Sequence, residues 1–315
     1  MKKILLFALT LAVLASCATN PSATEKIGVS REEISFPIGD KIPNPAFTGD
    51  AFLKNLIALD SIFNFPQTNV VTFSPGSHSA WHRHGGMVVV VTDGVGLYQE
   101  EGKPAQILRK GDVLQIPAGV RHWHGATKDN WFSQMVIYDM MWNSTENHAD
   151  EDNTVSDEYY ANLEMVEFDH PVKNDSTLMF AAPAETIQLP TFNGPIRLAN
   201  TVPNNNVAGG PGLHYVVFEP GVINAWHTHP GGQILIATDG IGYHQIEGQP
   251  VEVLHPGDVA LCPPGVKHWH GGSAGTRFAH LAAGTNPGMP PVEWTDQYLS
   301  KEEYDKLPIP PHGDK

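Results

Sequence analysis

Cysteine is scarce in this sequence, because the 315 residues contain only Cys17 and Cys262. A scaffold held by several disulfides is therefore excluded, and so is a zinc finger built from cysteine ligands. Positive charge is also scarce, with 19 lysines and arginines against 34 aspartates and glutamates. Binding of DNA or RNA requires a basic surface for the phosphates, so the net charge of −15 argues against nucleic acid as a partner.

The N-terminal region lacks a hydrophobic run long enough to span a membrane. Its apolar segment, residues 4–15, has 12 residues, whereas a transmembrane helix needs about 20. Lys2 and Lys3 precede this segment, an order typical of an export signal. The following residues, Leu14-Ala15-Ser16-Cys17, resemble the lipobox of bacterial lipoproteins, which implies cleavage before Cys17 and lipid on its sulfur. We therefore expect an exported lipoprotein, anchored to a membrane through Cys17 and facing the periplasm.

The chain repeats itself at a spacing of 144 to 146 residues. Four pairs of segments match in the same order: 74–84 with 219–229, 91–96 with 237–242, 110–113 with 256–259, and 116–125 with 262–271. A fifth pair, 155–163 with 299–307, predicts a short helix ending each copy, and Ser300 and Glu303 have the spacing of a capping box. The sequence thus predicts a signal peptide in residues 1–17, a tether in 18–30, and two domains, 31–165 and 166–315.

Each copy has the pattern of a β domain. Short apolar runs at residues 87–92 and 233–238 end in Asp93-Gly94 and Asp239-Gly240, which predict tight turns after the strands. The 30 glycines and 26 prolines favour a turn-rich fold over a helix bundle. We therefore predict an all-β protein made of sandwiches or barrels.

Three histidines and a glutamine of the second copy have the spacing of a metal site. His227 and His229 are two residues apart, so on a strand both side chains project to the same face. His268 adds a third imidazole from a later strand, and Gln233 can supply an amide oxygen. Neutral imidazoles are common metal ligands, and three of them leave open positions for a substrate or water.

The same residues resemble the motifs of the cupin superfamily: a glycine, His-x-His, a Glu or Gln four residues later, and then Pro-x-Gly-x-x-His. Both motifs occur twice, so the chain is similar to a bicupin. The resemblance implies two tandem double-stranded β-helix (jelly-roll) barrels with short terminal helices and one metal inside each barrel. In the second copy it implies the ligands His227, His229, Gln233 and His268.

The first copy departs from this pattern. His82, His84 and His122 occupy the histidine positions, but Met87 stands where the second copy has its glutamine. A thioether is a weak ligand for a hard divalent ion, and the loop after His84 is one residue shorter. His78, which has no histidine counterpart in the second copy, could serve as a replacement ligand. Metal binding in the first barrel is therefore left open.

The second copy has a narrower resemblance, to small manganese-dependent cupins that include hydroxynitrile lyases and to cupins associated with carboxymuconolactone decarboxylases. On this resemblance His270 and His280 are the candidates for proton transfer, because both are expected on the interior face. The first copy has His124 and Gln134 at these positions, so we expect catalysis in the second barrel. Three histidines are further candidates for a pocket wall: His214, His78 and His124.

The sequence therefore predicts a metal-dependent lyase acting on a small hydroxylated or carbonyl compound. The ion would act as a Lewis acid and a histidine would transfer the proton. Manganese is the expected cofactor, while Fe, Zn, Ni and Cu stay open because metal identity also follows availability. Two other functions stay open: a dioxygenase with Fe or Cu, and a non-catalytic module that binds a carbohydrate or another small ligand. The oligomeric state, including a homo-oligomer, is also left open.

Overall fold

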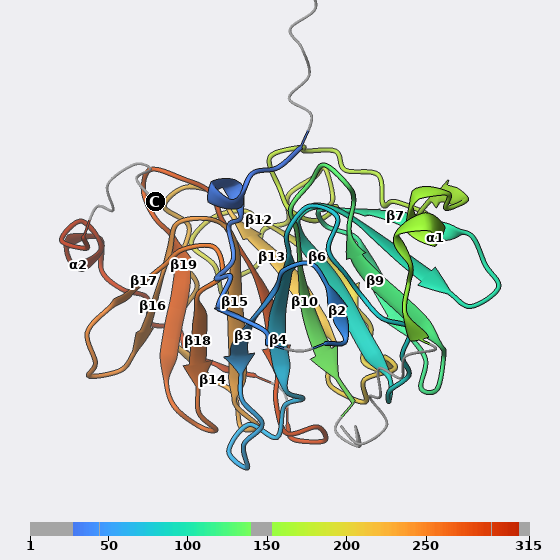
Figure 1. Ribbon diagram of the computed structural model, residues 1–315. Helices are drawn as coiled ribbons and strands as arrows, with labels where there is room; N and C mark the ends of the chain where they lie inside the picture. The colour runs from blue at the N-terminus through green and yellow to red at the C-terminus, as the bar shows by residue number, and fades with distance from the viewer. Residues whose placement is uncertain (1–27, 44, 140–152, 291, 309–315) are drawn as a thin grey trace, which may run out of the picture.

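The computed structural model describes residues 28–43, 45–139, 153–290 and 292–308. The expected signal peptide, its lipobox and most of the tether lie outside these residues. Two barrels of antiparallel strands stand side by side, the first coloured blue to green and the second yellow to red (Figure 1). The predicted all-β fold of tandem jelly-roll barrels is confirmed. In the part of the chain that is described, no helix combines the length and apolar character needed to cross a membrane.

The first barrel is built around one long strand, β6, which belongs to both of its layers. Strand order is β1-β3-β4-β10-β6-β9-β5-β2, with β7 and β8 also paired to β6, and with β11 parallel to β7. The bounds are β1 Asp40–Lys41, β2 Phe47–Thr48, β3 Ala51–Ile57, β4 Thr68–Phe73, β5 His78–Ser79, β6 Met87–Glu100, β7 Ala105–Arg109, β8 Val113–Ile116, β9 His122–Ala126, β10 Phe132–Tyr138 and β11 Met165–Glu167, preceded by the 3-10 turn Arg31–Glu33.

The second barrel has the same plan in two five-stranded sheets. One has the order β12-β13-β20-β15-β18 and the other β17-β16-β19-β14-β21. The bounds are β12 Ile196–Val202, β13 Leu213–Phe218, β14 His227–Thr228, β15 Gln233–Gly240, β16 Gly242–Ile246, β17 Glu252–Leu254, β18 Val259–Cys262, β19 His268–Gly272, β20 Phe278–Gly284 and β21 Glu293–Trp294.

The expected tight turns at the two Asp-Gly pairs are wrong. In the first barrel β6 continues through Asp93 and Gly94, and the second barrel has only a one-residue break, at Ile241, between β15 and β16. A β-bulge next to each pair bends the strand from one layer to the other. Gly94 and Gly240 have positive φ, and a Cβ there would lie 1.8 and 1.7 Å from a carbonyl oxygen of the neighbouring strand connection. Only glycine fits such a kink.

The largest apolar core lies between the barrels. Residues of β4, β6 and β10 on the outer face of one barrel belong to the same buried cluster as residues of β13, β15 and β20 on the other. The contributing strand residues include Val70, Val88, Val90, Met135, Ile137, Tyr215, Val217, Ile234, Ile236, Ala279 and Leu281. Burial of one such side chain stabilises by about 1.5–3 kcal/mol, so the shared sheet faces hold the barrels together.

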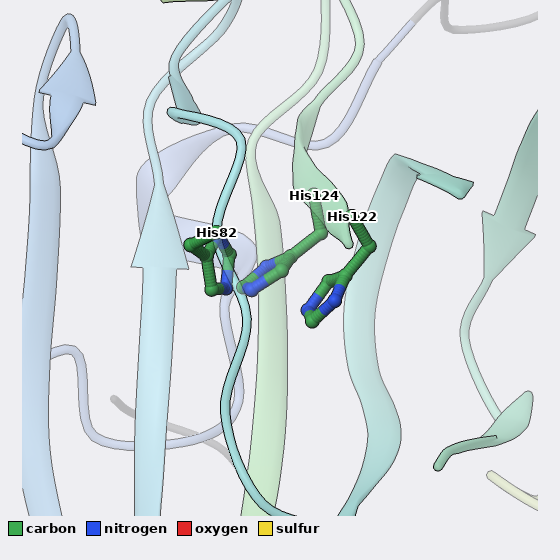
Figure 2. A group of neighbouring side chains, drawn as sticks. All are labelled: His82, His122 and His124. Carbon is green, nitrogen blue, oxygen red and sulfur yellow. The ribbon is translucent and has the colours of Figure 1, made fainter. Parts of the chain in front are cut away.

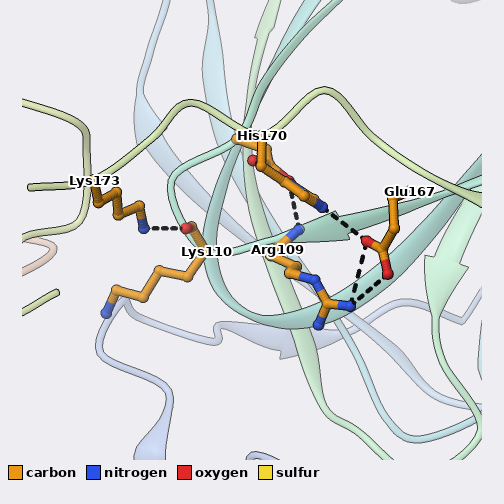
Figure 3. A network of polar contacts seen from close by, with 6 residues as sticks. Arg109, Lys110, Glu167, His170 and Lys173 are labelled. Carbon is orange, nitrogen blue, oxygen red and sulfur yellow. Dashed lines mark hydrogen bonds and ion pairs between the residues drawn. The ribbon is translucent and has the colours of Figure 1, made fainter.

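A polar network fastens the connection between the barrels to the first one (Figure 3). Strand β11 pairs with β7, so the chain as far as Glu167 packs with the first barrel. Beyond β11, His170 Nδ1 lies 2.8 Å from Asp112 Oδ2 and its Nε2 lies 2.9 Å from Glu167 Oε2. Arg109 completes the network by pairing with Glu167 at 3.0 Å.

Each barrel also contributes a loop to the rim of the other. The loop between β3 and β4 of the first barrel reaches the second, where the Ile62 carbonyl accepts from Asn286 Nδ2 at 2.8 Å. In the reverse direction, the loop between β12 and β13 of the second barrel reaches the first, where the backbone N–H of Val207 donates to Oε1 of Gln115 at 3.2 Å. A Cβ on Gly86 would lie 1.8 Å from the Val207 carbonyl oxygen, so glycine is required where this loop arrives. The loops that carry Ile62 and Val207 occupy equivalent places in the repeat. Each barrel therefore contributes the same loop to the other.

The predicted terminal helices are present as α1 Asp157–Ala161 and α2 Lys301–Tyr304. Ser156 and Ser300 cap them, and Ser300 with Glu303 forms the expected capping box. Tyr160 donates to a carbonyl of β9 at 2.6 Å, and Tyr304 donates to one of β19 at 2.8 Å. Each helix thus binds the outer side of the strand whose inner side carries histidines.

Candidate metal centres and their surroundings

The candidate ligands of the second barrel come together inside it. His227 is the first residue of β14, His268 is the first of β19, and the two are paired directly across these strands. His229 follows β14, and its ligand nitrogen lies with those of His227 and His268 within 4.8 Å of one another. Gln233 begins β15, and its Oε1 lies 3.0 Å from His268 Nε2. The structure thus places all four predicted residues at one point.

Backbone carbonyls orient two of these imidazoles. His227 Nδ1 donates to the Ala225 carbonyl at 2.9 Å, and His268 Nδ1 donates to the Val266 carbonyl at 3.0 Å. Both rings therefore present the Nε2 lone pair to the interior. Burial lowers the pKa of His227 and of His229 to about 4 and that of His268 to about 2. At neutral pH these are uncharged imidazoles, the form that binds a metal.

The contacts inside this cluster fit a cation. His227 Nε2 is buried and has no hydrogen-bond partner among the described residues. His268 Nε2 faces Gln233 Oε1, although both atoms are acceptors once Nδ1 of the ring donates to a carbonyl. A divalent ion beside these lone pairs would satisfy them, and the set of three imidazole nitrogens and one amide oxygen suits a first-row transition metal. His227, His229, Gln233 and His268 are thus the residues that would hold it.

Asn224, which the sequence analysis did not single out, determines the tautomer of His270. The backbone N–H of His270 can only donate, so the atom that accepts it at 2.9 Å is Asn224 Oδ1. The other atom of the amide is therefore Nδ2, which donates to His270 Nε2 at 3.0 Å. His270 consequently carries its own proton on Nδ1, which is buried without a partner. Its Nε2 lone pair is occupied, so His270 is a poor base.

His280 is in a different situation. It lies on β20, fully buried, with its ring centroid 4.9 Å from that of His270. Neither of its ring nitrogens makes a hydrogen bond of normal geometry with a described residue. Burial lowers its pKa to about 3, so it is an uncharged imidazole at neutral pH. Of the two predicted proton carriers, His280 is the one with a free lone pair.

A further histidine, His244 on β16, also faces the interior. The sequence left its direction open, but its register opposite His270 places both side chains on one face. Its Nδ1 lies 2.7 Å from Glu252 Oε2 and its Nε2 lies 3.0 Å from Cys262 Sγ. Burial raises the pKa of the Cys262 thiol, so this sulfur stays protonated. The His244 ring packs beside the His268 ring, with centroids 5.7 Å apart.

The second cluster opens to solvent on the side of His229. A cavity of about 430 Å³ is lined by His229, Thr285, Asn286 and Met289, together with glycines and prolines of the surrounding loops. On the other side, the indole of Trp294 covers His227, with ring centroids 4.5 Å apart. A molecule that reaches the cluster therefore approaches past His229.

The histidine cluster of the first barrel differs from the prediction. The ligand nitrogens within 4.8 Å of one another belong to His82, His122 and His124, which lie together in Figure 2. His84 is outside this group, although its ring lies 4.7 Å from that of His122 and its Nε2 is buried without a partner. Its Nδ1 bonds the carbonyl of Gly85. The loop after His84 has one residue fewer than the loop after His229, and only His229 belongs to the cluster of its barrel.

The pairing of the strands shows which residue of the first barrel corresponds to Gln233 of the second. Met87 pairs with Ile116 as Gln233 pairs with Cys262, so the thioether occupies the glutamine position. Met87 lines a cavity of about 320 Å³ in this barrel, and His82, His84 and His124 line it as well.

Two candidate wall residues lie elsewhere. His78 packs between Trp123 and Tyr160, at centroid distances of 5.6 and 5.0 Å, on the outer side of the barrel. Strand β5 ends at Ser79, so the alternation that would have brought His78 and His82 to one face is interrupted. His214 is half-buried and bonds Asn200 on the adjacent strand at 2.7 Å. The alternative that His78 replaces a missing ligand is therefore wrong, whereas His124 does line the cavity.

Known proteins resemble this chain in both fold and sequence. The family model for the cupin domain matches residues 69–138 and 214–281, once in each barrel. The (R)-mandelonitrile lyase of Granulicella tundricola is 48% identical over 89 residues, which are 28% of this chain and 67% of that protein. This similarity lies in the second half.

Solved structures with both barrels show the same architecture at low identity. The oxalate decarboxylase of Lactobacillus farciminis, in complex with formate, is 13% identical and has a TM-score of 0.51, covering 87% of this chain and 96% of its own. A variant of the Bacillus subtilis oxalate decarboxylase is 14% identical with a TM-score of 0.51, covering 87% of this chain and 85% of its own. Such identities establish a shared fold only.

Proposed function

Because the chain belongs to the cupin superfamily and carries two of its barrels in tandem, we propose that the second barrel is a metal-dependent lyase site for a small hydroxylated or carbonyl compound. One observation carries the proposal: a complete donor set, His227, His229, Gln233 and His268, shares the barrel with the unbonded, buried imidazole of His280. Similarity of this half to a protein named a lyase supports it.

The four donors would bind and orient the ion, whose Lewis acidity polarises a substrate oxygen and lowers its pKa. The ion we propose is manganese, on the resemblance of this half to manganese-dependent cupins, with Fe, Zn, Ni and Cu as the other outcomes of metal analysis. Trp294 covers one side of the cluster and excludes water there. The substrate would reach the cluster past His229, through the loop-lined mouth.

His280 takes and returns the proton in this proposal. Burial lowers the pKa of His280, so its imidazole is uncharged at neutral pH and can accept the proton that the substrate releases. His270 holds its proton on Nδ1 because Asn224 occupies Nε2. We therefore assign it the role of positioning the neighbouring histidines rather than that of exchanging protons. The two histidines that the sequence treated alike thus have separate roles.

A turnover assay with two matched histidine variants tests the proposal. Protein expressed from residue 18 is loaded with Mn²⁺ or Fe²⁺ and given cyanohydrins, small 2-hydroxy carbonyl compounds and lactones. We expect His280→Gln to lower turnover by about 10² to 10⁴ with metal content unchanged. We expect His270→Gln instead to weaken metal binding by about 10- to 100-fold. His255→Gln, the same change at an exposed loop residue, is the control and should alter neither.

The assay also separates the other functions. Oxygen consumption that accompanies turnover would replace the lyase with a dioxygenase. A ligand that binds metal-loaded protein and stays chemically unchanged would replace it with a binding module. Full turnover in His280→Gln would remove that residue from the mechanism.

We also propose that the mature protein is a lipoprotein facing the periplasm. The support is the sequence of residues 14–17, which resembles a lipobox after a short apolar segment.

A further inference from the structure

We propose that the first barrel positions the candidate metal centre of the second. Its loop between β3 and β4 holds Asn286, and Asn286 holds the turn that carries His229. The inference rests on the proposed function in one respect, because it takes His229 as a donor to the ion. The residues that it adds, Asp60 and Asn286, are not donors themselves, so their role is to position one.

His229 is the donor whose ring has the least support of its own. His227 and His268 begin strands, and backbone carbonyls accept from their Nδ1 atoms. His229 follows the end of β14, and burial alone lowers the pKa of its ring, with no hydrogen bond to it from the described residues. The position of this imidazole therefore depends on the turn 229–232, which connects β14 to β15.

The residues that follow β20 hold this turn from one side. Thr285 Oγ1 donates to the Gly231 carbonyl at 2.6 Å, and Asn286 Nδ2 donates to the same carbonyl at 2.8 Å. The two segments approach so closely that a Cβ on Gly231 would lie 2.3 Å from the Thr285 carbonyl oxygen. A displacement of Asn286 would therefore displace the turn as well.

The Asn286 amide also bonds the first barrel. Its Nδ2 donates to the Ile62 carbonyl at 2.8 Å, and the backbone N–H of Asn286 donates to the Phe63 carbonyl at 3.2 Å. Both partners of the side chain are carbonyls, which only accept, so the two protons of the amide nitrogen must face them. The φ of Asn286 is 52°, a conformation that asparagine adopts more readily than most residues. One amide group thus bridges the His229 turn and the other barrel.

The first-barrel loop that receives Asn286 is itself well anchored. Asp60 Oδ1 accepts the backbone N–H of Ile62 at 2.9 Å and that of Phe63 at 2.8 Å. Phe63 and Phe65 are buried in the apolar core that the two barrels share. The loop therefore presents two carbonyls in a fixed direction. Because Asp60 is exposed, this arrangement can be loosened without a change in the core.

The first barrel has a different residue at the position of Asn286. Met140 comes two residues after the end of β10, as Asn286 comes two residues after the end of β20. Met140 lies outside the described residues, but a methionine side chain has no N–H to donate. His84, the counterpart of His229, is also the histidine outside the cluster of its barrel. The amide bridge thus belongs to the barrel that has the complete donor set.

Hydrogen exchange in metal-free, glycine-labelled protein tests the inference by NMR. The backbone N–H groups of Gly232 and Gly265 both donate to the His229 carbonyl at 2.9 Å, so their exchange reports on the turn. The N–H of Gly119 donates to the His84 carbonyl at 2.9 Å, which is the equivalent bond of the first barrel. It is the internal reference, because a general loss of stability would speed its exchange as well.

Two variants loosen the bridge from its two ends. We expect Asp60→Ala and Asn286→Gly each to speed exchange at the turn by about tenfold or more, with the reference unchanged, because each removes hydrogen bonds that hold the turn. Asp60→Asn keeps the accepting oxygen and should restore the wild-type rate. Asn64→Gly is the matched control, since Asn64 also has a positive φ but is exposed, and it should change neither rate.

The affinity for Mn²⁺, measured by competition with a chelator, is the second readout. We expect Asp60→Ala and Asn286→Gly to weaken by about 10- to 100-fold the site that His229→Ala removes. Mn²⁺ binding that does not respond to His229→Ala would refute the proposed donor set, whereas the exchange rates would still decide the inference.

The exchange rates can overturn the inference in two ways. Unchanged exchange at the turn in both Asp60→Ala and Asn286→Gly would show that the bridge does not position His229. Faster exchange in Asn286→Gly but not in Asp60→Ala would remove the first barrel from this role.

Discussion

We expect Asn224→Ala to destabilise the protein more than Ser79→Ala, the same change at the equivalent position of the first barrel. Asn224 is fully buried and makes two side-chain hydrogen bonds to His270, one to the backbone N–H and one to Nε2. Its removal leaves both groups of His270 without partners. Because each such buried group costs about 1–3 kcal/mol, the expected loss is roughly 2–6 kcal/mol.

The control variant leaves a single buried group without a partner. Ser79 Oγ accepts the backbone N–H of His124 at 3.2 Å, and this donor loses its partner. Ser79 Oγ also lies 3.5 Å from His82 Nδ1, but that nitrogen keeps its hydrogen bond to the Ala80 carbonyl. The expected loss is about 1–3 kcal/mol, half of that at Asn224. Urea unfolding in the presence of a chelator measures both values, because bound metal would otherwise add its own stabilisation.

Nitrogen NMR of histidine-labelled protein provides the second measurement. In the wild type we expect the His270 proton on Nδ1, as the contact of Nε2 with the Asn224 amide requires. In Asn224→Ala this constraint is lost, and the proton distribution between the two nitrogens should change. Equal destabilisation in the two variants, together with an Nε2–H tautomer in the wild type, would refute the assignment.

Three further predictions concern metal, pH and location. His227→Ala combined with His268→Ala should remove at least one equivalent of first-row transition metal per chain by elemental analysis; retention of that equivalent would contradict the assignment. Burial lowers the pKa of His170, but hydrogen bonds to Asp112 and Glu167 outweigh burial and raise it overall. Its stabilisation is therefore complete below the usual pKa of 6.5 and is lost as the pH rises through the folded value. The difference in urea midpoint between wild type and His170→Gln should accordingly shrink from about pH 6 to pH 9, and a constant difference would be inconsistent with this reasoning. Cys17→Ser should abolish lipid labelling and release the protein from membranes, and persistent membrane association would place the anchor elsewhere.

The repeat made much of the fold predictable. Two copies of the same motifs at one spacing predicted two barrels, and alternation along β14 correctly brought His227 and His229 to one cluster. Such inferences depend only on local strand geometry. They succeed where a strand is regular over the residues compared.

The errors arose where strands are interrupted. His78 and His82 are four residues apart, but β5 ends between them and their side chains diverge. Beside the shortened loop after His84, His124 rather than His84 joins His82 and His122 in the first cluster. The Asp-Gly pairs became kinks because neighbouring strands continue the pairing through them. Tertiary contacts decide these details, and a single sequence does not display them.

Asn224 was missed for a different reason. Its partner His270 is 46 residues away, and neither residue type nor spacing connects them. Once the fold is known, its place three residues before His227 puts it beside β19, where a buried amide must find partners. Polar residues flanking a His-x-His motif are therefore worth testing as positioning groups.

The exchanged rim loops change what counts as a unit in this protein. The rim of each barrel includes backbone from the other half, because the Ile62 carbonyl meets Asn286 of the second barrel and the Val207 carbonyl meets Gly86 of the first. A half expressed alone would have an unfinished rim as well as a bare sheet face. Cutting the connection near His170 would leave the halves associated, since the covalent link is only one of their attachments. A substitution in either rim loop therefore acts on the mouth of the neighbouring barrel as well as on its own.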